Sequence, residues 1–224
     1  MLWTPGLAEG EVTPTDEFLR WMELSSGEYI LQVGRFEPRK NCLASILATK
    51  DIDLPLVFIV TAPLQNDSPL AVLYEKTCLE AAYHFRKAPT YIIHQRLPTM
   101  HTDHLHIVQM PEGKKLSRSM ILSAFAHAAV HLHPAFSELP GYTYLESARL
   151  GTPTIASAWA TLPDYLEGNP TLGGVIDYAI PHDLAVMTSL VERKLSQKRR
   201  SPPDHPIFHR RAVDVAGDIL QAMR

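Results

Sequence analysis

The sequence predicts an α/β fold built on a doubly wound, mostly parallel sheet, and three observations lead to that class. Strand-like and helix-like segments alternate through most of the 224 residues, in the order expected of βαβ units. The run LVFIV at 56–60 is apolar throughout, which is typical of a strand that helices bury on both faces. Residues 130–158 read as strand, loop, helix, tight turn and strand in direct succession.

The elements of the first half follow from local patterns. The run YILQV at 29–33 predicts a strand that leads into a loop and a helix. Asp67-Ser68-Pro69 predicts the next helix start, because it offers a capping side chain and a proline in the first turn. That helix is expected to end near Arg86, and strands are predicted at 91–93 and 105–108. Its predicted apolar face holds Leu70, Leu73, Tyr74, Thr77, Cys78 and Ala81.

The second half continues the alternation. In order, the predicted elements are a helix from Ser117, a strand at 130–133, a helix closed by Gly151-Thr152-Pro153, a strand at 154–157, a sheet segment at 173–176, a helix from His182-Asp183 and a final helix at about 208–223. The helix from His182 ends in the basic run 194–200. That run is expected to be solvated and to balance the helix dipole.

The composition is that of a globular protein. The formal net charge is −3, from 24 acids against 21 bases, so the chain has no basic surplus for a nucleic acid. A hydrophobic content of 46% is enough for a proper core, and no apolar run is long enough to span a bilayer. The start of the chain has no signal-peptide pattern, so a cytoplasmic location is expected.

Cysteines and histidines predict no metal site. Cys42 and Cys78 each lie in an apolar helical pattern, where buried reduced thiols are expected. Residues 101–106 hold three His and one Asp, a composition that suggests metal ligands. Neither a cysteine nor a spaced second cluster accompanies them, so we interpret these histidines as loop and strand-surface residues.

Two segments carry charged residues where doubly wound sheets bind ligands. The loop GRFEPRKN at 34–41 joins a strand to a helix, an arrangement in which helix amides and cations converge on a phosphate. Glu138 and Glu146 can both point at the carboxyl edge of the sheet, and His133 could approach the same pocket. The alternatives are surface bases in the loop, and two solvated acids near a helix start, where the dipole favours negative charge.

These segments resemble the donor site of retaining GT-B glycosyltransferases of family four, the glycosyl transferases group 1. The loop 34–41 is similar to the family's GR-x-x-x-K-N segment. The resemblance covers roughly 29–195 and implies a Rossmann-like sheet that is one half of a GT-B fold, the C-terminal, donor-binding domain. The downstream residues that carry it are Pro134, Glu138, Gly141, Leu145-Glu146, Gly151 and Pro153.

The resemblance implies a role for each matching residue. Arg35 and Lys40 would grip the diphosphate of a nucleotide-sugar and Glu138 would contact its sugar, which makes these three the catalytic residues. Glu146 would hold the ribose hydroxyls. Arg39 matches no family position and is interpreted as a solvated neighbour. The other implied donor-binding residues are Gly34, Met110, Pro111, Gly141, Tyr142 and Thr143.

Some of these positions are ambiguous. Met110 and Pro111 would meet the nucleotide base, or else be ordinary core and turn residues. Leu139-Pro140 stands where the family commonly has Gly-Phe, and Pro140 removes an amide that could donate to a ligand. The identity of the sugar is therefore left open.

The implied division is a linker and short helix at 1–27, a nucleotide-sugar-binding domain at 28–200 and a C-terminal helix at 201–224. The implied activity is glycosyl transfer from a UDP- or GDP-linked sugar to an unknown acceptor, with no cofactor and no metal. The implied partner is an N-terminal acceptor domain or a separate subunit. Any peripheral association with a membrane is expected only through that missing domain. The isolated chain is expected to be inactive in transfer. The alternatives are a non-catalytic nucleotide-sugar-binding subunit and a GT-B-like sugar-nucleotide epimerase.

Overall fold

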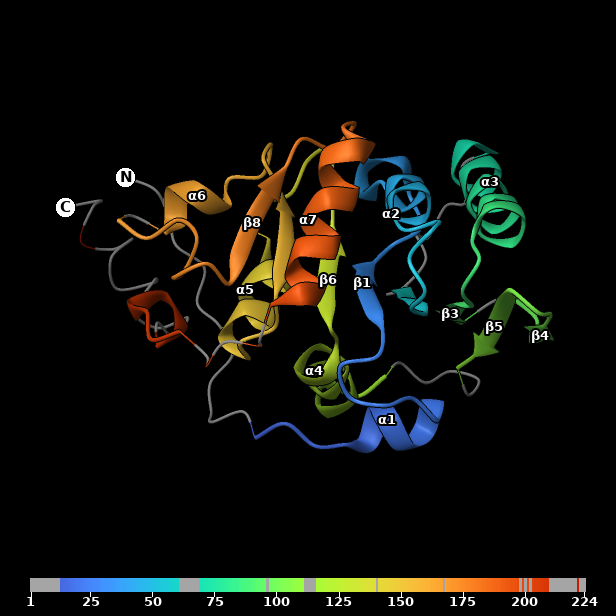
Figure 1. Cartoon of the computed structure of the whole chain (residues 1–224), viewed down its shortest axis with the longest axis horizontal. Helices are drawn as coiled ribbons and strands as arrows, with labels where there is room; N and C mark the ends of the chain where they lie inside the picture. Colours follow the sequence, from blue (N-terminus) through green and yellow to red (C-terminus); the bar gives the residue numbers. More distant parts are fainter. Residues whose placement is uncertain are drawn as a thin grey trace.

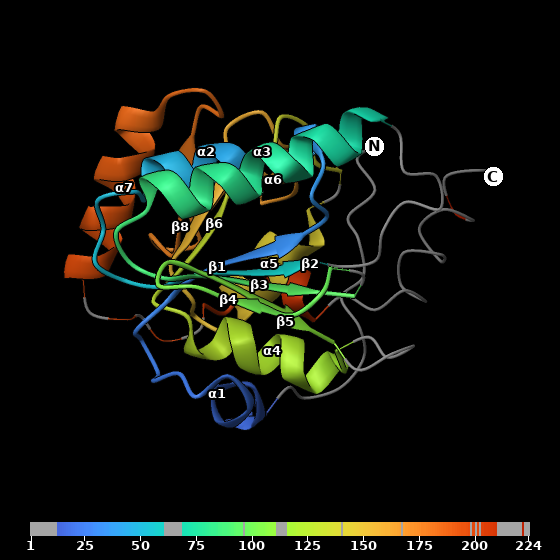
Figure 2. The ribbon, with the colours of Figure 1, turned by 90° about the vertical axis from the view of Figure 1, so that its right-hand side faces the viewer.

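The centre of the molecule is an eight-stranded sheet with helices on both faces (Figures 1 and 2). The computed structural model describes residues 13–60, 69–95, 97–110, 116–139, 141–166, 168–197, 199, 201, 203–209 and 221. The strand order is β4-β5-β3-β2-β1-β6-β7-β8, and every neighbouring pair is parallel except β4 with β5. The predicted fold class is therefore confirmed. The strands are β1 Ile30–Gly34, β2 Leu56–Val60, β3 Thr90–His94, β4 Met100–His101, β5 Leu105–Gln109, β6 Val130–His133, β7 Thr154–Ser157 and β8 Ile176–Ala179.

The central strands are buried on both faces, as the apolar run in β2 predicts. All five β2 residues are buried, and their side chains alternate between two cores. Leu56 and Phe58 face the core under α2 (Cys42–Ala48), α3 (Pro69–Phe85) and α7 (Leu184–Ser196). Val57 and Ile59 face the core under α1 (Glu17–Met22) and α4 (Arg118–His127). Figure 2 shows these two helical layers above and below the sheet.

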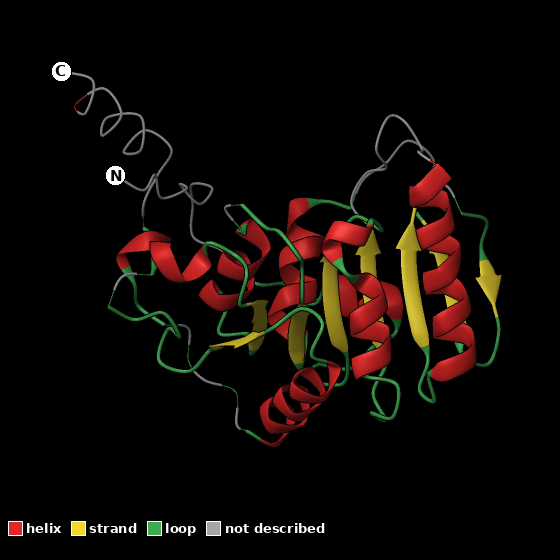
Figure 3. Ribbon diagram, turned by 90° about the horizontal axis from the view of Figure 1, so that it is seen from above, coloured by secondary structure: helices red, strands yellow, loops and turns green. Residues whose placement is uncertain are grey.

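A third core closes the β8 end of the sheet. It joins α5 (Tyr142–Arg149) to α6 (Leu162–Tyr165) and to the short 3-10 helix η2 (Pro206–Phe208). Tyr144 and Leu145 of α5 are fully buried in it. Because α5 is anchored in this way, the residues at its first turn have fixed positions relative to the strands. Figure 3 shows the strands side by side; the parallel strands have their carboxyl ends at one edge, and β4 runs the opposite way.

The strand order reverses between β1 and β6, which are neighbours in the sheet. From β1 the chain continues to β2 on one side, and from β6 it continues to β7 on the other. The loops after β1 and β6 therefore leave the same edge in opposite directions, and doubly wound sheets bind ligands at such a point. Both segments singled out by the sequence, 34–41 and 134–141, begin at this point.

The structure corrects several predicted elements. The last strand is β8 at Ile176–Ala179, after the predicted 173–176, because turns continue through residue 175. The two-residue strand β4 is too short to leave a sequence pattern. Leu70 and Leu73 were predicted to face the core but are 64% and 61% exposed, because the core contact of α3 begins at Tyr74.

The ends of the chain are described only in part. Phe18 and Met22 of α1 are buried, as expected of the short helix near the start. The predicted helix start at 67–68 and most of the predicted helix at 208–223 lie outside the described residues. Cys42 and Cys78 are buried and not joined in a disulfide. Among the described helices, none has the length and apolar character to cross a membrane.

Candidate functional site

The end of β1 packs closely against the end of β6, and this packing requires a glycine. A Cβ on Gly34 would lie 3.3 Å from His133 Cε1 and 3.8 Å from Lys40 Cδ. Asn41, with φ of 55°, then turns the chain into α2. Its Nδ2 donates to the carbonyls of Pro134 (3.0 Å) and Pro181 (2.7 Å), so one side chain ties together the loops after β1, β6 and β8.

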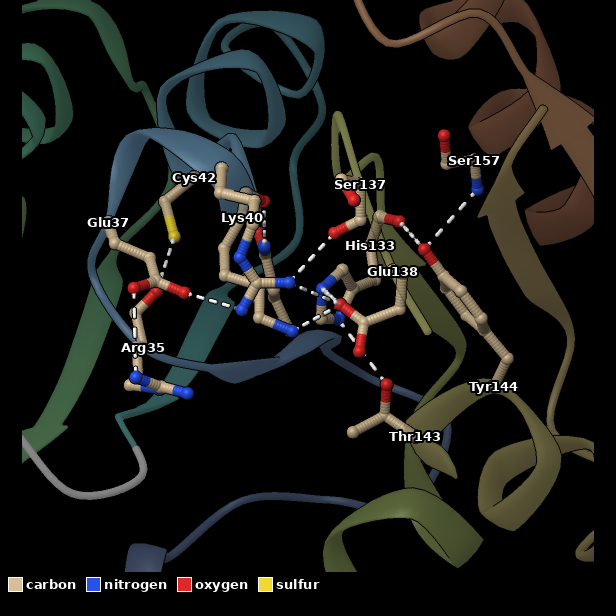
Figure 4. A network of polar contacts seen from close by, with 12 residues as sticks. Arg35, Glu37, Lys40, Cys42, His133, Ser137, Glu138, Thr143, Tyr144 and Ser157 are labelled. Carbon is tan, nitrogen blue, oxygen red and sulfur yellow. Dashed lines mark hydrogen bonds and ion pairs between the residues drawn. The ribbon is translucent and has the colours of Figure 1, made fainter. Parts of the chain in front are cut away.

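Lys40 and Glu138, on the loops that follow β1 and β6, form a nearly buried ion pair. The Lys40 Nζ donates to Glu138 Oε2, a contact drawn as a dashed line in Figure 4. The two side chains are only 10% and 12% exposed. Gln32 of β1 donates to the Lys40 carbonyl at 3.0 Å, which fixes the lysine backbone. A charge-assisted contact with so little water around it is strong, but it can be replaced by another anion of the right geometry.

Arg39 has a positioning role that the sequence analysis did not assign. Its Nη1 donates to the Ser137 carbonyl at 2.8 Å and lies 3.6 Å from Glu138 Oε2. Its Nη2 donates to Glu37 Oε1 at 2.7 Å. Arg39 is 41% exposed, as expected of a solvated neighbour, and its side chain also links the loop after β1 to the loop after β6.

Arg35 is less engaged. Its Nη1 lies 3.8 Å from Glu37 Oε2, and its side chain is 40% exposed. Figure 4 shows Arg35 beside Glu37 and apart from the Lys40–Glu138 contact. The two cations that the sequence analysis assigns to a diphosphate thus lie on one loop without converging. A long, exposed arginine can rotate toward an anion bound at Lys40 at little cost.

His133 lies buried beneath the ion pair. Its Nε2 is 3.8 Å from Glu138 Oε2, and its Nδ1 is 3.5 Å from Thr143 Oγ1. Burial, with smaller contributions from His131, Lys40 and Arg39, holds the pKa of His133 well below its usual value. The imidazole is therefore neutral at pH 7. His133 therefore lies beside Glu138, the acid that the family resemblance assigns to the donor sugar.

The start of α5 is shaped by Gly141 and Tyr144. Gly141 has φ of +78°, and a Cβ there would lie 2.7 Å from Tyr144 Cδ2, so no other residue fits without strain. The Tyr144 hydroxyl donates to the His133 carbonyl at 2.6 Å. Tyr142 is 46% exposed at the same turn. Pro140, whose effect on a ligand the sequence leaves open, lies outside the described residues.

Glu146, the second predicted acid, lies one turn further along α5. Its Oε1 is 2.8 Å from Arg118 Nη1, at the first residue of α4. Met110 is 3% exposed, and its side chain belongs to the core under α1 and α4, so only its backbone borders the edge of the sheet. Pro111 lies outside the described residues.

The histidine-rich segment lies in β4 and β5, at one end of the strand order and three strands away from β1. His101 of β4 and His106 of β5 are cross-strand partners with their Nδ1 atoms 3.3 Å apart. Among the described residues, no group of three or more His, Cys, Asp or Glu side chains could hold a metal ion.

Sequence reasoning missed two residues of this site, Arg39 and Arg118. Arg39 lies in the same loop as Lys40, but its contact with Ser137 joins residues 98 positions apart. Arg118 immediately follows the predicted helix start at Ser117. A basic residue at the first position of a helix whose start faces the carboxyl edge is the signal that could have identified it.

Several solved structures share this fold. Sucrose-phosphate synthase from Thermosynechococcus elongatus matches with a TM-score of 0.66 and 18% identity, over 94% of this chain and 48% of that chain. A trehalose-phosphate synthase from Burkholderia xenovorans, in complex with glucose-6-phosphate, matches with a TM-score of 0.62 and 13% identity, over 90% and 43%. The C-terminal domain of a glycosyl transferase group 1 family protein from Francisella tularensis matches with a TM-score of 0.54 and 13% identity, over 95% and 96%.

These matches establish the fold. The structural neighbours are GT-B glycosyltransferases, and the chain has the α/β fold of one half of such an enzyme. It spans about half the length of the synthases and nearly the whole of the isolated C-terminal domain. No protein-family model and no curated protein sequence matches the chain.

Proposed function

We propose that this chain is the donor-binding half of a retaining glycosyltransferase that uses a nucleoside-diphosphate sugar. The observation that carries the proposal is the Lys40–Glu138 ion pair at the point where the strand order reverses. A cation for a diphosphate and a carboxylate for sugar hydroxyls lie there side by side, on loops whose positions the sheet fixes. The fold shared with GT-B glycosyltransferases supports the same conclusion.

Donor binding would exchange the partner of Lys40. The diphosphate competes with Glu138 for the ammonium group, and Arg35 rotates toward the same anion. Glu138 keeps two polar neighbours when Lys40 changes partner, because Arg39 lies 3.6 Å and His133 lies 3.8 Å from its Oε2. The carboxylate is then available to accept bonds from hydroxyl groups of the donor sugar.

The same cations would assist the chemical step. In the transfer, the bond between the anomeric carbon and the diphosphate oxygen breaks, and its electron pair leaves with the nucleoside diphosphate. The acceptor oxygen bonds to the anomeric carbon, and its proton passes to the oxygen of the departing diphosphate. Lys40 and Arg35 would neutralise the charge that develops on the leaving group, a contribution that is large in a site with little water. Retention of the anomeric configuration is part of the proposal.

The acceptor site is proposed to lie on a second domain. The chain spans about half of the synthases that it resembles in fold. Transfer needs an acceptor oxygen held close to the anomeric carbon and water kept away from it, which a single open edge does not provide. We therefore expect the isolated chain to bind donor, to hydrolyse it slowly at most, and to transfer sugar only with a partner domain or subunit.

Calorimetric titration tests the proposal. UDP-, GDP- and ADP-sugars and the free nucleoside diphosphates are each titrated into the purified chain in the presence of a chelator. We expect one nucleotide class to bind with 1:1 stoichiometry. Failure of every nucleotide to bind would remove the proposal. Binding that disappears with chelator and returns with a divalent metal would contradict its metal-free form.

A further inference from the structure

Arg118 and Glu146 form an ion pair between the starts of α4 and α5. Arg118 is the first residue of α4 and Glu146 lies in the second turn of α5, and both helices start at the carboxyl edge of the sheet. Arg118 Nη1 is 2.8 Å from Glu146 Oε1. Among the described residues, Arg118 is the sole hydrogen-bond or ion-pair partner of the Glu146 side chain.

The two side chains have different environments. Glu146 is 16% exposed, whereas Arg118 is 50% exposed. The start of α4 is fixed, because Ser117 Oγ accepts from the Met120 amide at 3.1 Å and Ser119 Oγ donates to Glu17 Oε2 at 3.0 Å. A planar guanidinium on a fixed helix start restricts the rotation of the carboxylate that it contacts.

The Glu146 carboxylate can accept further hydrogen bonds while it is paired with Arg118. An ionised carboxylate has about four acceptor positions, and the contact with Arg118 through Oε1 uses one of them. Oε2 has no protein donor among the described residues. A pair of neighbouring hydroxyl groups, such as the 2′- and 3′-hydroxyls of a ribose, supplies donors at the spacing of the two oxygens of one carboxylate.

We propose that Arg118 is a positioning residue that holds Glu146 in the orientation that accepts both ribose hydroxyls, and so sets the preference for ribonucleotides over 2′-deoxyribonucleotides. The inference rests on the proposed function and on the contact with the ribose hydroxyls that the family resemblance implies for Glu146. Arg118 acts through the carboxylate and is not assigned a contact with the reacting atoms.

The test compares the affinity ratio of a nucleoside diphosphate and its 2′-deoxy analogue in four variants. In the wild type we expect the deoxy form to bind about tenfold or more weakly, the value of one lost hydrogen bond to a charged group. Glu146→Gln brings the ratio near one. Arg118→Ala lowers the ratio several-fold, and Arg118→Lys, which keeps the charge but not the planar fork, recovers part of it.

Arg193→Ala is the matched control. Arg193 is 51% exposed and lies 2.9 Å from Asp177, so its exposure and ion-pair distance are close to those of Arg118. It lies in α7 and contacts β8, away from the start of α4. We expect Arg193→Ala to keep the wild-type ratio, which separates positioning from a general loss of surface charge.

The outcomes distinguish the inference from the function on which it rests. If Arg118→Ala keeps the ratio while Glu146→Gln loses it, the role of Arg118 is wrong and the proposed function stands. If Arg118→Ala binds both nucleotides more tightly, the arginine blocks the acid instead of positioning it. If the wild type binds no nucleotide, both the proposed function and this inference are wrong.

Discussion

Two buried lysines in this molecule are held in different ways. Lys194 of α7 is 3% exposed, and its Nζ donates to the carbonyls of Gly174 (2.7 Å) and Val175 (3.2 Å). It also lies 2.9 Å from Asp177 Oδ2. Two of these partners are backbone carbonyls, which cannot rotate away as a side chain can. The expectation that the basic run 194–200 is solvated is wrong at this lysine, because the α7 surface at that position packs on β8.

Lys40 is 8% exposed, yet the only partner of its ammonium group among the described residues is the Glu138 carboxylate. Two of its three donors have no partner in the described part of the chain, and the partner of the third is a side chain on another loop. This difference indicates that Lys194 stabilises the fold, whereas Lys40 is available to bind a ligand. Lys194 is fixed by the backbone, whereas Lys40 can change partner when an anion arrives.

The largest expected effect is on nucleotide binding. Changing both Arg35 and Lys40 to Ala removes two charge-assisted contacts, each worth about 1.5–3 kcal/mol, so calorimetry should show a loss of about a hundredfold or more in diphosphate affinity. Lys50→Ala, at a lysine whose side chain is 54% exposed, is the control and should bind as the wild type does. An unchanged affinity in the double variant would place the diphosphate elsewhere.

The next effect is on stability and compares the two lysines directly. Lys194→Met leaves two buried carbonyls and part of a carboxylate without a donor, and breaking such a buried arrangement costs about 3 kcal/mol or more. Lys40→Met orphans no carbonyl, and Glu138 keeps Arg39 at 3.6 Å. Urea unfolding should therefore show Lys194→Met to be less stable than Lys40→Met by about 2 kcal/mol. Equal losses would remove the distinction between the two lysines.

A further effect concerns the dependence of stability on pH, through His131 of β6. Burial lowers the pKa of His131 to about 3, while its Nδ1 bonds to Ser147 Oγ at 2.9 Å. Below the unfolded-state pKa of about 6.5 the unfolded chain binds a proton that the folded chain excludes. The free energy of unfolding therefore falls as the pH drops from about 6.5 toward 3, by up to about 1.4 kcal/mol per pH unit.

His131→Asn tests this contribution, because an amide can replace the bond to Ser147 without a titrating group. Urea unfolding between pH 6.5 and 4.5 should give a shallower loss of stability in this variant than in the wild type. His104→Asn, at an exposed histidine, is the control. If His131→Asn and His104→Asn show the same slope as the wild type, burial of His131 does not govern the acid sensitivity.

Local sequence patterns predicted most strands and the segments of the site, because these depend on short-range rules. The apolar run of β2, the glycine at the end of β1 and the Ser117 helix start are all readable in this way. The contacts between segments were not predictable from such rules. Lys40 and Glu138 are 98 positions apart in the chain, and they are in contact because β1 and β6 are neighbours in the sheet.

The same limit explains the errors. The burial of Lys194 depends on how α7 lies over β8, and the exposure of Leu70 and Leu73 depends on where α3 meets the core. Helical periodicity gives the face of a helix but not the length over which a neighbour covers it. The family resemblance supplied roles for Glu138 and Glu146, but it did not indicate that each acid pairs with a basic residue in the structure.

The preference for the sugar of the donor tests the account most directly. Calorimetry gives the affinity of the wild type and of Glu138→Gln for a nucleoside diphosphate and for its sugar conjugate. We expect the wild type to favour the conjugate and Glu138→Gln to lose this preference. The variant should bind the plain diphosphate at least as well as the wild type, because Lys40 is released from its internal partner. An equal loss of affinity for both ligands in Glu138→Gln would contradict the assignment of the acid to the sugar and of the lysine to the diphosphate.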